Sequence, residues 1–369
     1  MTAFTDEQVA FREAIRDFSA RECGTREQRA AWPDEDHDEH SQPLYEKLAE
    51  LGWLETEDHL THTVLFEELY RGLVPVRAIG PTTTVKGCYE RFASDDQRDE
   101  ALEQIAKGKV MAISISEPGA GSDVSAISAT AKPGDGGWIV NGQKTWCSFA
   151  HIADRTLLVA RTSKEEKPHQ GLTVFEVPAG LEGVETHRIE TMGGSEVNDV
   201  FYTDVFLEED AVVGEIGQGF RQIMSGLDGE RLLAAAVGLG LAQRALDDLL
   251  AYVKERKQFG KPIGTFQAVR HRIADLAIEL ECARLITYEV AARMDARDPS
   301  VSAVTSMAKV KATEVATKTT LEGMQLMGGY GYASEYEMEG LVRASLVTPI
   351  YAGTNEIQRD IISGSLGLR

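Results

Sequence analysis

The sequence contains no run of about 18 apolar residues, the length that a membrane-spanning helix needs. It also lacks a charged leader followed by a short apolar segment, which is the pattern of a secretory signal peptide. Both absences argue against membrane insertion and export, so we expect a cytoplasmic protein. With 369 residues, 43% of them hydrophobic, the chain is long enough for two or three structural units.

Cysteine and positive charge are also scarce. The four cysteines, Cys23, Cys88, Cys147 and Cys282, form no CxxC pair and no metal-ligand spacing with histidine, so we expect reduced thiols and no metal. The acidic run Asp34–His40 lacks the fixed spacing of metal ligands and predicts a solvated loop. A formal net charge of -21 repels polyanions, which argues against nucleic-acid and anionic-membrane partners. Any anionic ligand therefore needs donors that are gathered locally.

The apolar pattern changes twice along the chain. Residues 1–108 carry apolar residues three and four apart, as at Phe11, Ile15 and Phe18, and predict a helical domain. Residues 109–215 hold short runs rich in Val, Ile, Thr and Phe between Gly and Pro, and predict a β-domain. Residues 216–369 return to long amphipathic stretches and predict a helical domain of four-helix size. We expect strands at Val110–Ile115, Leu157–Ala160 and Leu172–Val177, and helices at Arg231–Lys254, Phe266–Met294 and Val301–Met327.

Five short motifs occur in a fixed order over nearly the whole chain. They are Ser116–Asp123 (SEPGAGSD), Asn141–Trp146 (NGQKTW, expected in the second strand), Arg256–Lys261 (RKQFGK), Gln325–Gly329 (QLMGG) and Tyr351–Arg359 (YAGTNEIQR). One of them alone would be an ordinary turn or helix cap. Together they resemble the acyl-CoA dehydrogenase family. The resemblance implies an α+β, mostly helical fold: an N-terminal helical domain, a middle β-barrel-like domain and a C-terminal four-helix bundle.

The resemblance also implies FAD as cofactor. Small residues in Ser116–Ser122 let main-chain N–H groups and hydroxyls approach a flavin ring or phosphate. In the family, Ser122 also touches the substrate, Trp146 covers the ring and Ser148 places its hydroxyl near flavin N5. Core packing is the alternative for Trp146. The resemblance assigns FAD binding in this region to Ile115, Ser116, Gly121, Ser122, Trp146, Cys147 and Ser148.

A second set of cofactor residues lies in the C-terminal region. A guanidinium such as that of Arg256 matches phosphate oxygens two at a time, although Arg256 alone would also suit a helix C-terminus. In the family, this arginine, Gln267 and the Gln325–Gly329 segment reach the flavin of a neighbouring subunit. The implied assembly is a homotetramer, a dimer of dimers. The full set implied by resemblance is Arg256, Gln258, Phe259, Gln267, Gln325, Leu326, Gly328, Gly329, Thr354, Asn355 and Glu356.

The catalytic base departs from the family's commonest pattern. Many members carry a glutamate directly before the Gly-Thr of the last motif, where this chain has Ala352. The isovaleryl and long-chain types supply the glutamate from the helix after the β-domain instead, and the matching residue here is Glu230. A solvated helix residue is the alternative for Glu230. We expect Glu230 to be the base, because the usual position has lost its acid and the apolar run Leu232–Val237 follows.

The implied reaction is FAD-dependent α,β-dehydrogenation of an acyl-CoA to the 2-enoyl-CoA. Glu230 takes the proton, flavin N5 takes the hydride, and an electron-transferring flavoprotein accepts the electrons. Asp228 and Arg231 can pair at three residues' spacing and, by resemblance, line the pantetheine arm. The resemblance implies that Ala352 and Gly353 also contact the substrate, since in the family the N–H at position 352 bonds the thioester oxygen together with the flavin ribityl hydroxyl.

Three other functions fit the same sequence. A related enzyme could act on acyl or aminoacyl groups bound to a carrier protein, docked through Arg270, His271 and Arg272. An oxidase or flavin monooxygenase of this fold would differ in how fast its reduced flavin reacts with oxygen. A catalytically silent, flavin-binding partner subunit would explain Ala352, but the flavin motifs and Glu230 argue against it.

Overall fold

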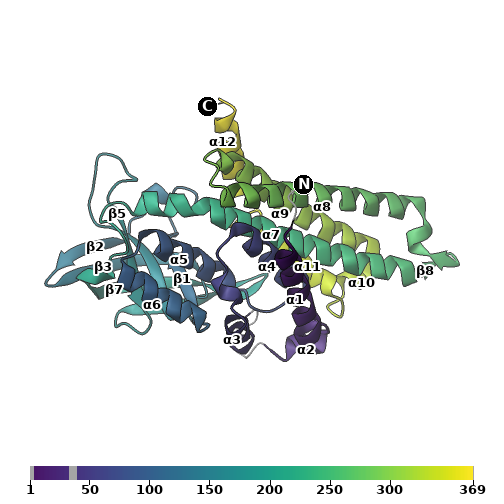
Figure 1. The fold of residues 1–369 in the computed structure, drawn as a ribbon, viewed down its shortest axis with the longest axis horizontal. Helices are drawn as coiled ribbons and strands as arrows, with labels where there is room; N and C mark the ends of the chain where they lie inside the picture. Colours follow the sequence, from purple (N-terminus) through teal and green to yellow (C-terminus); the bar gives the residue numbers. More distant parts are fainter. Residues whose placement is uncertain (1–3, 33–39, 369) are drawn as a thin grey trace. The chain divides into compact units, whose positions relative to one another are not determined.

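The computed structural model describes residues 4–32 and 40–368 of the chain. These residues form two compact units. Unit 1 consists of the described parts of Met1–Ala30, Glu57–Val74 and Asp228–Arg369, and unit 2 of those of Ala31–Thr56 and Pro75–Leu227. Along the chain, helices come first, strands second and helices again last, as predicted (Figure 1). The α+β, mostly helical fold class is therefore confirmed.

Unit 1 is almost entirely helical. Its elements are α1 (Asp6–Cys23), α2 (Arg26–Ala30), α4 (His59–Arg71), the part of α7 (Gly219–Glu255) from Asp228 onward, β8 (Lys257–Gln258), β9 (Lys261–Pro262), η4 (Ile263–Thr265), α8 (Gln267–Asp295), α9 (Val301–Met327), α10 (Gly329–Tyr332), α11 (Glu337–Leu346) and α12 (Asn355–Ser365). The three long helices predicted in this region are confirmed as α7, α8 and α9.

Two glycines let α7 pack closely on its neighbours in unit 1. A Cβ on Gly238 would lie 2.9 Å from the carbonyl oxygen of Ala312 on α9. One on Gly240 would lie 2.4 Å from the carbonyl oxygen of Glu67 on α4. Only a residue without a side chain permits this approach of helix backbones. Figure 1 shows the long helices α7, α8 and α9 running alongside one another.

Two adjacent carboxylates on α4 are buried in unit 1, and both are paired. Glu67 accepts hydrogen bonds from Arg284 Nε at 3.1 Å and from the Tyr288 hydroxyl at 2.5 Å, both on α8. Glu68 accepts two bonds from the Arg16 guanidinium on α1, at 2.9 and 2.6 Å. Removing one partner of such a pair would leave a buried charge uncompensated. These contacts therefore fix α1, α4 and α8 to one another.

Unit 2 contains a seven-stranded sheet with helices α3, α5 and α6. The strand order is β1-β4-β2-β3-β7-β6, and β5 pairs with β4. Strand β1 runs parallel to β4, whereas β3 pairs antiparallel with both β2 and β7. The elements are α3 (Gln42–Glu50), η1 (Trp53–Glu55), α5 (Ile79–Phe92), α6 (Asp95–Ala106), β1 (Met111–Ser114), η2 (Val124–Ala126), β2 (Thr130–Gly134), β3 (Gly137–Ser148), β4 (Arg155–Arg161), β5 (Leu172–Pro178), β6 (Val184–Thr191), β7 (Gly194–Glu208) and η3 (Glu209–Ala211).

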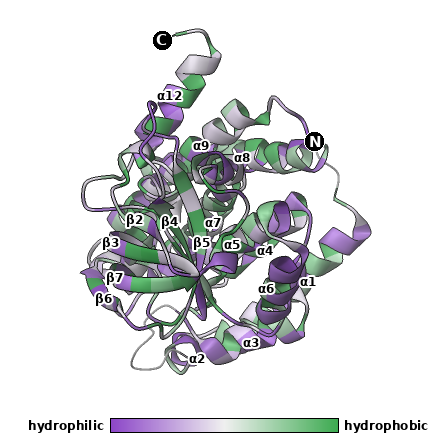
Figure 2. Cartoon of the chain, turned by 90° about the vertical axis from the view of Figure 1, so that its left-hand side faces the viewer, coloured by the Kyte–Doolittle hydropathy of each residue, from purple (hydrophilic) through white to green (hydrophobic). Residues whose placement is uncertain are grey.

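The core of unit 2 is formed by the hydrophobic side chains of this sheet. Val140, Leu158, Phe175, Val200 and Val205 are among its fully or nearly fully buried members. The strands carry green stretches of hydrophobic residues in Figure 2. All three predicted strands are present, as β1, β4 and β5. The NGQKTW motif, however, lies in the third strand, β3, and not in the second, because a short strand at Thr130–Gly134 precedes it.

Cys23, Cys88 and Cys147 are buried, whereas Cys282 is exposed. Most of the run Asp34–His40 lies outside the described residues, but His40 is fully buried, so the solvated-loop prediction is wrong for His40. Its ring packs against those of Tyr45 and Phe149, a contact between distant segments that local sequence does not indicate. Within residues 4–32 and 40–368, no helix is long and apolar enough to cross a bilayer.

Candidate functional site

The Gly-rich loop that follows β1 in unit 2 presents open backbone. Glu117 and Ala120 exchange two main-chain hydrogen bonds, of 2.9 and 3.0 Å, which fold the loop into a tight turn. A Cβ built on Gly119 or Gly121 would meet no atom within 4 Å. Ser122 is exposed, while Ile115 and Ser116 are half-buried. The loop therefore offers main-chain and hydroxyl groups to a ligand, as a flavin requires.

A buried ion pair fixes this loop to the sheet. Lys144 on β3 donates to Glu117 Oε1 at 2.8 Å and to the Ile115 carbonyl oxygen at 2.8 Å. Glu117 also accepts from the backbone N–H groups of Ser128 and Ala129, at 2.8 and 2.9 Å. Burial disfavours the charge on Glu117, but the bonds from Lys144 and Ser128 outweigh it and lower the pKa of Glu117. Both residues lie within the motifs, but this role was not predicted from the sequence.

Trp146 lies on the surface of β3. Its side chain is 59% exposed and its φ is 59°. The ladder between β3 and β7 shifts register between Lys144 and Cys147, and such a bulge turns the residue at its centre away from the regular strand direction. The alternative interpretation, that Trp146 packs in the core, is therefore wrong. An exposed indole beside the Gly-rich loop's strand suits stacking on a flat ring.

Cys147 and Ser148, which follow Trp146, differ in environment. The Cys147 thiol is buried, lies 3.0 Å from the Ser114 hydroxyl, and has its pKa raised by burial to about 11. Only the main chain of Cys147 can serve a ligand on the open face. Ser148 is half-buried. The roles of these residues in cofactor binding remain predictions.

Glu230 lies on α7 in unit 1 and is half-buried. Among the residues that the structure describes, none donates a hydrogen bond to its carboxylate. Burial raises the pKa of Glu230, and the positive charges of Arg231 and Lys309 act in the opposite direction. A carboxylate in such surroundings is a stronger base than one in water, which is the property that abstraction of a carbon-bound proton requires.

Asp228 and Arg231 form the predicted pair beside Glu230. Arg231 Nη1 donates to Asp228 Oδ1 at 2.7 Å, at the expected spacing of three residues. Ser302 on α9 donates to the same oxygen at 3.0 Å. Arg231 is only 7% exposed. The pair therefore fixes the helix surface next to Glu230 and leaves the Glu230 carboxylate free of it.

The turn before α12 in unit 1 carries Ala352 and Gly353. Their φ angles are 54° and 76°. The Ala352 N–H donates to no acceptor within residues 4–32 and 40–368, so it is available to a carbonyl oxygen. Thr354 caps α12 by accepting from the Ile357 N–H at 3.3 Å. Asn355 is buried and bonds Lys309 inside the unit, whereas Glu356 is exposed.

The remaining predicted residues gather around the β8–β9 hairpin at the opposite end of α9. The Arg256 guanidinium carbon lies 5.2 Å from the ring centre of Tyr330, directly after the Gln325–Gly329 segment. Phe259, at the tip of the hairpin, is 93% exposed. Gln258, Gln267, Gln325, Gly328 and Gly329 are exposed and Leu326 is half-buried. Sixteen residues of α9, or about 24 Å at 1.5 Å per residue, separate Gln325 from Lys309.

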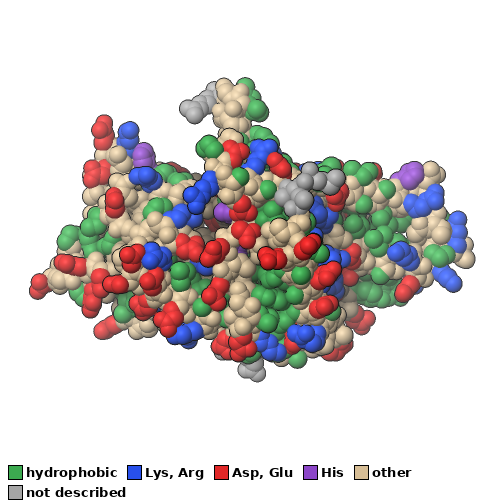
Figure 3. Space-filling view, in the orientation of Figure 1, with side chains coloured by type: hydrophobic (Ala, Val, Ile, Leu, Met, Phe, Trp, Pro, Cys, Tyr) green, Lys and Arg blue, Asp and Glu red, His purple; other side chains and the backbone are tan. Residues whose placement is uncertain are grey.

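This hairpin is also locally basic. Figure 3 shows Lys and Arg side chains, in blue, at the right-hand end over β8, on a face otherwise rich in acidic residues. Between residues 256 and 270, the positively charged residues are Arg256, Lys257, Lys261 and Arg270. The strongly acidic chain thus has the local cluster of donors that an anionic ligand needs.

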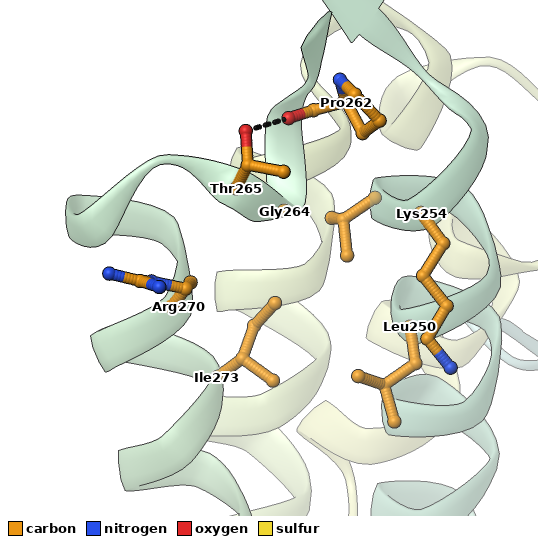
Figure 4. A pocket seen from close by; sticks show the side chains of 8 residues that line it. Leu250, Lys254, Pro262, Gly264, Thr265, Arg270 and Ile273 are labelled. Carbon is orange, nitrogen blue, oxygen red and sulfur yellow. Dashed lines mark hydrogen bonds between the residues drawn. The ribbon is translucent and has the colours of Figure 1, made fainter.

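A pocket of about 400 Å³ opens in unit 1 beside the hairpin (Figure 4). Leu250 and Ile273 line it with apolar surface, and Thr265 closes one side by donating to the Pro262 carbonyl oxygen at 2.7 Å. About 20 residues of α7 separate Leu250 from Glu230, which is about 30 Å along the helix. The pocket therefore belongs to the Arg256 region and not to the surroundings of Glu230.

Two residues in unit 1 were not predicted to have a role but contact the candidate site. Lys309 and Gln358 are fully buried and bond the turn that carries Ala352. A signal for Lys309 was present, since it lies at helical spacing with Thr305, Ala312 and Ala316 on a buried face of α9. No group of His, Cys, Asp and Glu in the described ranges is arranged to hold a metal ion.

Three family descriptions match successive parts of the chain. "Acyl-CoA dehydrogenase, N-terminal domain" matches residues 5–109, the middle domain residues 112–205, and the C-terminal domain residues 217–367. Together they span almost the whole sequence, in the order of the three regions expected from its pattern.

Known relatives cover the same span. The chain is 34% identical to the caffeyl-CoA reductase-Etf complex subunit CarC of Acetobacterium woodii, over 98% of this chain and 99% of the relative. It is 31% identical to the 3-(aryl)acrylate reductase of Clostridium sporogenes, over 98% and 99%. With the mitochondrial isovaleryl-CoA dehydrogenase of Solanum tuberosum it shares 34% identity, over 84% of this chain and 76% of the relative.

Solved structures agree with the sequence matches. The acyl-CoA dehydrogenase of Geobacillus kaustophilus superimposes with a TM-score of 0.93 over 100% of both chains, at 30% identity. A structure described as the FAD complex of PigA superimposes with a TM-score of 0.90 over 100% of both chains, at 27% identity.

Proposed function

The chain belongs to the acyl-CoA dehydrogenase family, oxidoreductases that act on CH–CH bonds with FAD, and on this premise we propose that it converts an acyl-CoA thioester to the 2-enoyl-CoA with Glu230 as the base. The single observation that carries the proposal is that the chain has a half-buried carboxylate at Glu230 and an alanine at position 352. On this proposal, the acid that abstracts the proton comes from α7.

The chemistry explains why a glutamate in these surroundings fits. The proton next to a thioester carbonyl is weakly acidic, so a base is effective only if its own proton affinity is high. Burial raises the pKa of Glu230 and supplies that affinity. Bound FAD supplies the two-electron oxidation. Asp228 forms an ion pair with Arg231, whereas the Glu230 carboxylate has no hydrogen-bond or ion-pair partner among the described residues.

A second requirement is polarisation of the thioester carbonyl. The Ala352 N–H supports this role, because it lacks an internal acceptor in the described part of the chain. Losing one donor of this kind from an enzyme typically costs about 2.7–4 kcal/mol of barrier. Replacing the usual glutamate by alanine leaves the backbone donor in place. We therefore infer that carbonyl polarisation and proton abstraction come from different segments of unit 1.

The residues that would hold FAD fall into two sets. In unit 2 the Gly-rich loop, Trp146 and Ser148 suit the ring and its polar edge, and the open space around Gly119 and Gly121 fits a close approach. In unit 1 the second set includes the Arg256 hairpin and Gln325, and Gln325 lies about 24 Å along α9 from Lys309. We propose that this second set serves the FAD of another copy, so that each site needs a homodimer and the assembly is a dimer of dimers.

The direction of the reaction is open to a second possibility. Two relatives that match 98% of the chain carry reductase names: one is a subunit of a caffeyl-CoA reductase-Etf complex and the other a 3-(aryl)acrylate reductase. The same Glu230, once protonated, would deliver the α-proton in the reverse reaction, and its raised pKa suits that role as well. An electron-transferring flavoprotein is the proposed redox partner in either direction.

An anaerobic spectral titration tests both directions. Butyryl-CoA, isovaleryl-CoA and 3-phenylpropionyl-CoA are added to the oxidised, FAD-loaded protein, and the corresponding enoyl-CoAs to the dithionite-reduced protein. We expect bleaching of the flavin by at least one saturated thioester. Reoxidation by an enoyl-CoA without bleaching by its saturated counterpart would favour a reductase. No reaction with any thioester, although FAD is bound, would contradict the proposal and direct attention to carrier-protein substrates.

A further inference from the structure

The turn between α11 and α12 needs support from outside itself. Two consecutive residues, Ala352 and Gly353, have left-handed backbone angles. Glycine adopts such angles freely, but the Cβ of an alanine disfavours them. The same turn presents the unpartnered Ala352 N–H noted above. Groups elsewhere in unit 1 must therefore hold this conformation.

Lys309 on α9 provides much of that support. Its Nζ donates to the carbonyl oxygens of Pro349 and Gly353, at 3.2 and 3.0 Å, and to Asn355 Oδ1 at 2.9 Å. The side chain is fully buried. An ammonium group has three N–H donors, and all three are used here. One charged group thus ties the start of the turn to its end.

Gln358 on α12 completes the arrangement. Its Nε2 donates to the carbonyl oxygens of Ala352 and Gly353, at 3.2 and 3.0 Å. Its Oε1 accepts from the Ser306 hydroxyl at 2.9 Å, one turn before Lys309 on α9. Both carbonyls of the turn are therefore occupied. The Ala352 N–H is left as a backbone polar group without a partner among the described residues.

Lys309 also acts on Glu230. The charged groups that face Lys309 are Glu356 of α12 and Glu230 and Arg231 of α7. Burial lowers the pKa of Lys309 to about 8, the two glutamates favour its charged form, and Arg231 opposes it. In return, the positive charge of Lys309 partly offsets the burial that raises the pKa of Glu230.

We propose that Lys309 is a positioning residue that serves both parts of the proposed chemistry, because a single buried ammonium group holds the turn presenting the Ala352 N–H and provides a positive charge near Glu230. The inference rests on the dehydrogenase function proposed above. It assigns a role to a residue outside the five motifs.

Loss of the Lys309 proton has a structural consequence. A neutral amine has two N–H groups, so one of the three acceptors loses its donor. The turn then loosens, and the Ala352 N–H is held less firmly. Activity should therefore fall as the pH rises through the pKa of Lys309, about 8.

The test compares Lys309→Met with Lys318→Met. Lys318 lies on the same helix, is half-exposed, and has only Glu279 as a partner among the described residues, at 3.8 Å. Hydrogen–deuterium exchange of the FAD-loaded protein reports on the turn at residues 350–356, and the pH profile of flavin reduction by the preferred acyl-CoA reports on Glu230. In Lys309→Met, we expect the amide hydrogens of this turn to exchange faster. We also expect the pH profile of flavin reduction to lose its alkaline limb and its acid limb to shift to higher pH. Lys318→Met should match the parent protein in all three respects.

Parent-like exchange and pH limbs in Lys309→Met would overturn the proposal. If this variant fails to fold, Glu356→Gln provides a second test, because Glu356 is exposed. Losing that negative charge should move the alkaline limb to lower pH, and an unmoved limb would overturn the proposal. If none of the acyl-CoAs reduces the flavin of the parent protein, the proposed function fails. The hydrogen–deuterium exchange comparison still decides whether Lys309 holds the turn.

Discussion

Lys144 Nζ lies 2.8 Å from Glu117 Oε1, and both side chains are buried. Glu117 belongs to the Gly-rich loop and Lys144 to β3, so the pair joins the loop to the sheet that supports it. The second bond from Lys144, to the Ile115 carbonyl oxygen, fixes the start of the loop. The position of the backbone that we expect to bind FAD therefore depends on a charge that never reaches solvent.

Replacing this lysine should cost both stability and cofactor. Lys144→Met leaves Glu117 charged and buried, and breaking a pair of this kind typically costs about 3–5 kcal/mol of unfolding free energy. We expect a lower urea midpoint and a reduced ratio of flavin to protein absorbance after gel filtration. The matched control is Lys132→Met, at an exposed position on β2. Full flavin content in Lys144→Met would mean that the loop does not need this anchor.

The raised pKa of Glu230 has a consequence for stability. A carboxyl group whose pKa is higher in the folded state than in the unfolded state stabilises the fold while it is protonated. This contribution is complete below the unfolded-state pKa, about 4.3, and is lost as the pH rises through the folded-state pKa. At neutral pH the ionised Glu230 is therefore a destabilising group. We expect Glu230→Gln to raise the Tm at neutral pH, with a difference that narrows as the pH falls.

The control for this measurement is Glu289→Gln on α8, where an exposed carboxylate pairs with Arg293 at 2.9 Å. Its Tm should change little across the same pH range, since exposed pairs contribute about 0–1 kcal/mol. A lower Tm for Glu230→Gln at neutral pH would indicate that the surroundings of Glu230 favour its charge, contrary to our interpretation.

The hairpin should contribute to FAD binding through a second copy. We expect Arg256→Ala and Phe259→Ala each to weaken FAD retention and to leave the secondary structure unchanged by circular dichroism. Met192, which is 62% exposed in unit 2, offers a control through Met192→Ala. Light scattering gives the mass of each species. A monomeric protein that retains FAD, or a Phe259→Ala variant with full FAD content, would contradict the shared site.

Local patterns in the sequence predicted local structure well. The helical period located α7, α8 and α9, and the Asp228–Arg231 pair followed from their spacing on one helix. Runs of β-branched residues located β1, β4 and β5, but the short strand β2, which contains Lys132, Pro133 and Gly134, carries few such residues and was missed. Features governed by neighbours within a few residues are readable from the chain itself.

Contacts between distant segments were harder to predict. Lys309 and Lys311 are two residues apart on α9, yet the first is buried under the turn before α12 and the second is partly exposed beside Glu279. The residues next to them in the sequence do not indicate that Lys309 donates to a cluster of backbone carbonyl oxygens. His40 was placed in a solvated loop because its neighbours are acidic, but packing against Tyr45 and Phe149 buries it. Tertiary contacts decide such positions.

The two possible places for a catalytic acid allow an exchange experiment. Ala352→Glu, added to Glu230→Gln, returns a carboxylate to the turn that carries it in many relatives. We expect partial recovery of flavin reduction by acyl-CoA, since the position is half-buried and its backbone is already held by Gln358. Ala352→Gln in the same background is the matched control and should recover nothing. Equal rates in the two double variants would mean that the new carboxylate does not act as a base.

Anaerobic flavin bleaching in Glu230→Gln tests the central claim most directly. The variant keeps the shape of the side chain and removes its basicity, so FAD content and the visible spectrum should match those of the parent protein. General-base catalysis typically contributes about 100-fold or more, so the rate of bleaching by the preferred acyl-CoA should fall by at least that factor. Bleaching at the parental rate in a fully FAD-loaded Glu230→Gln protein would remove Glu230 from its role as the base.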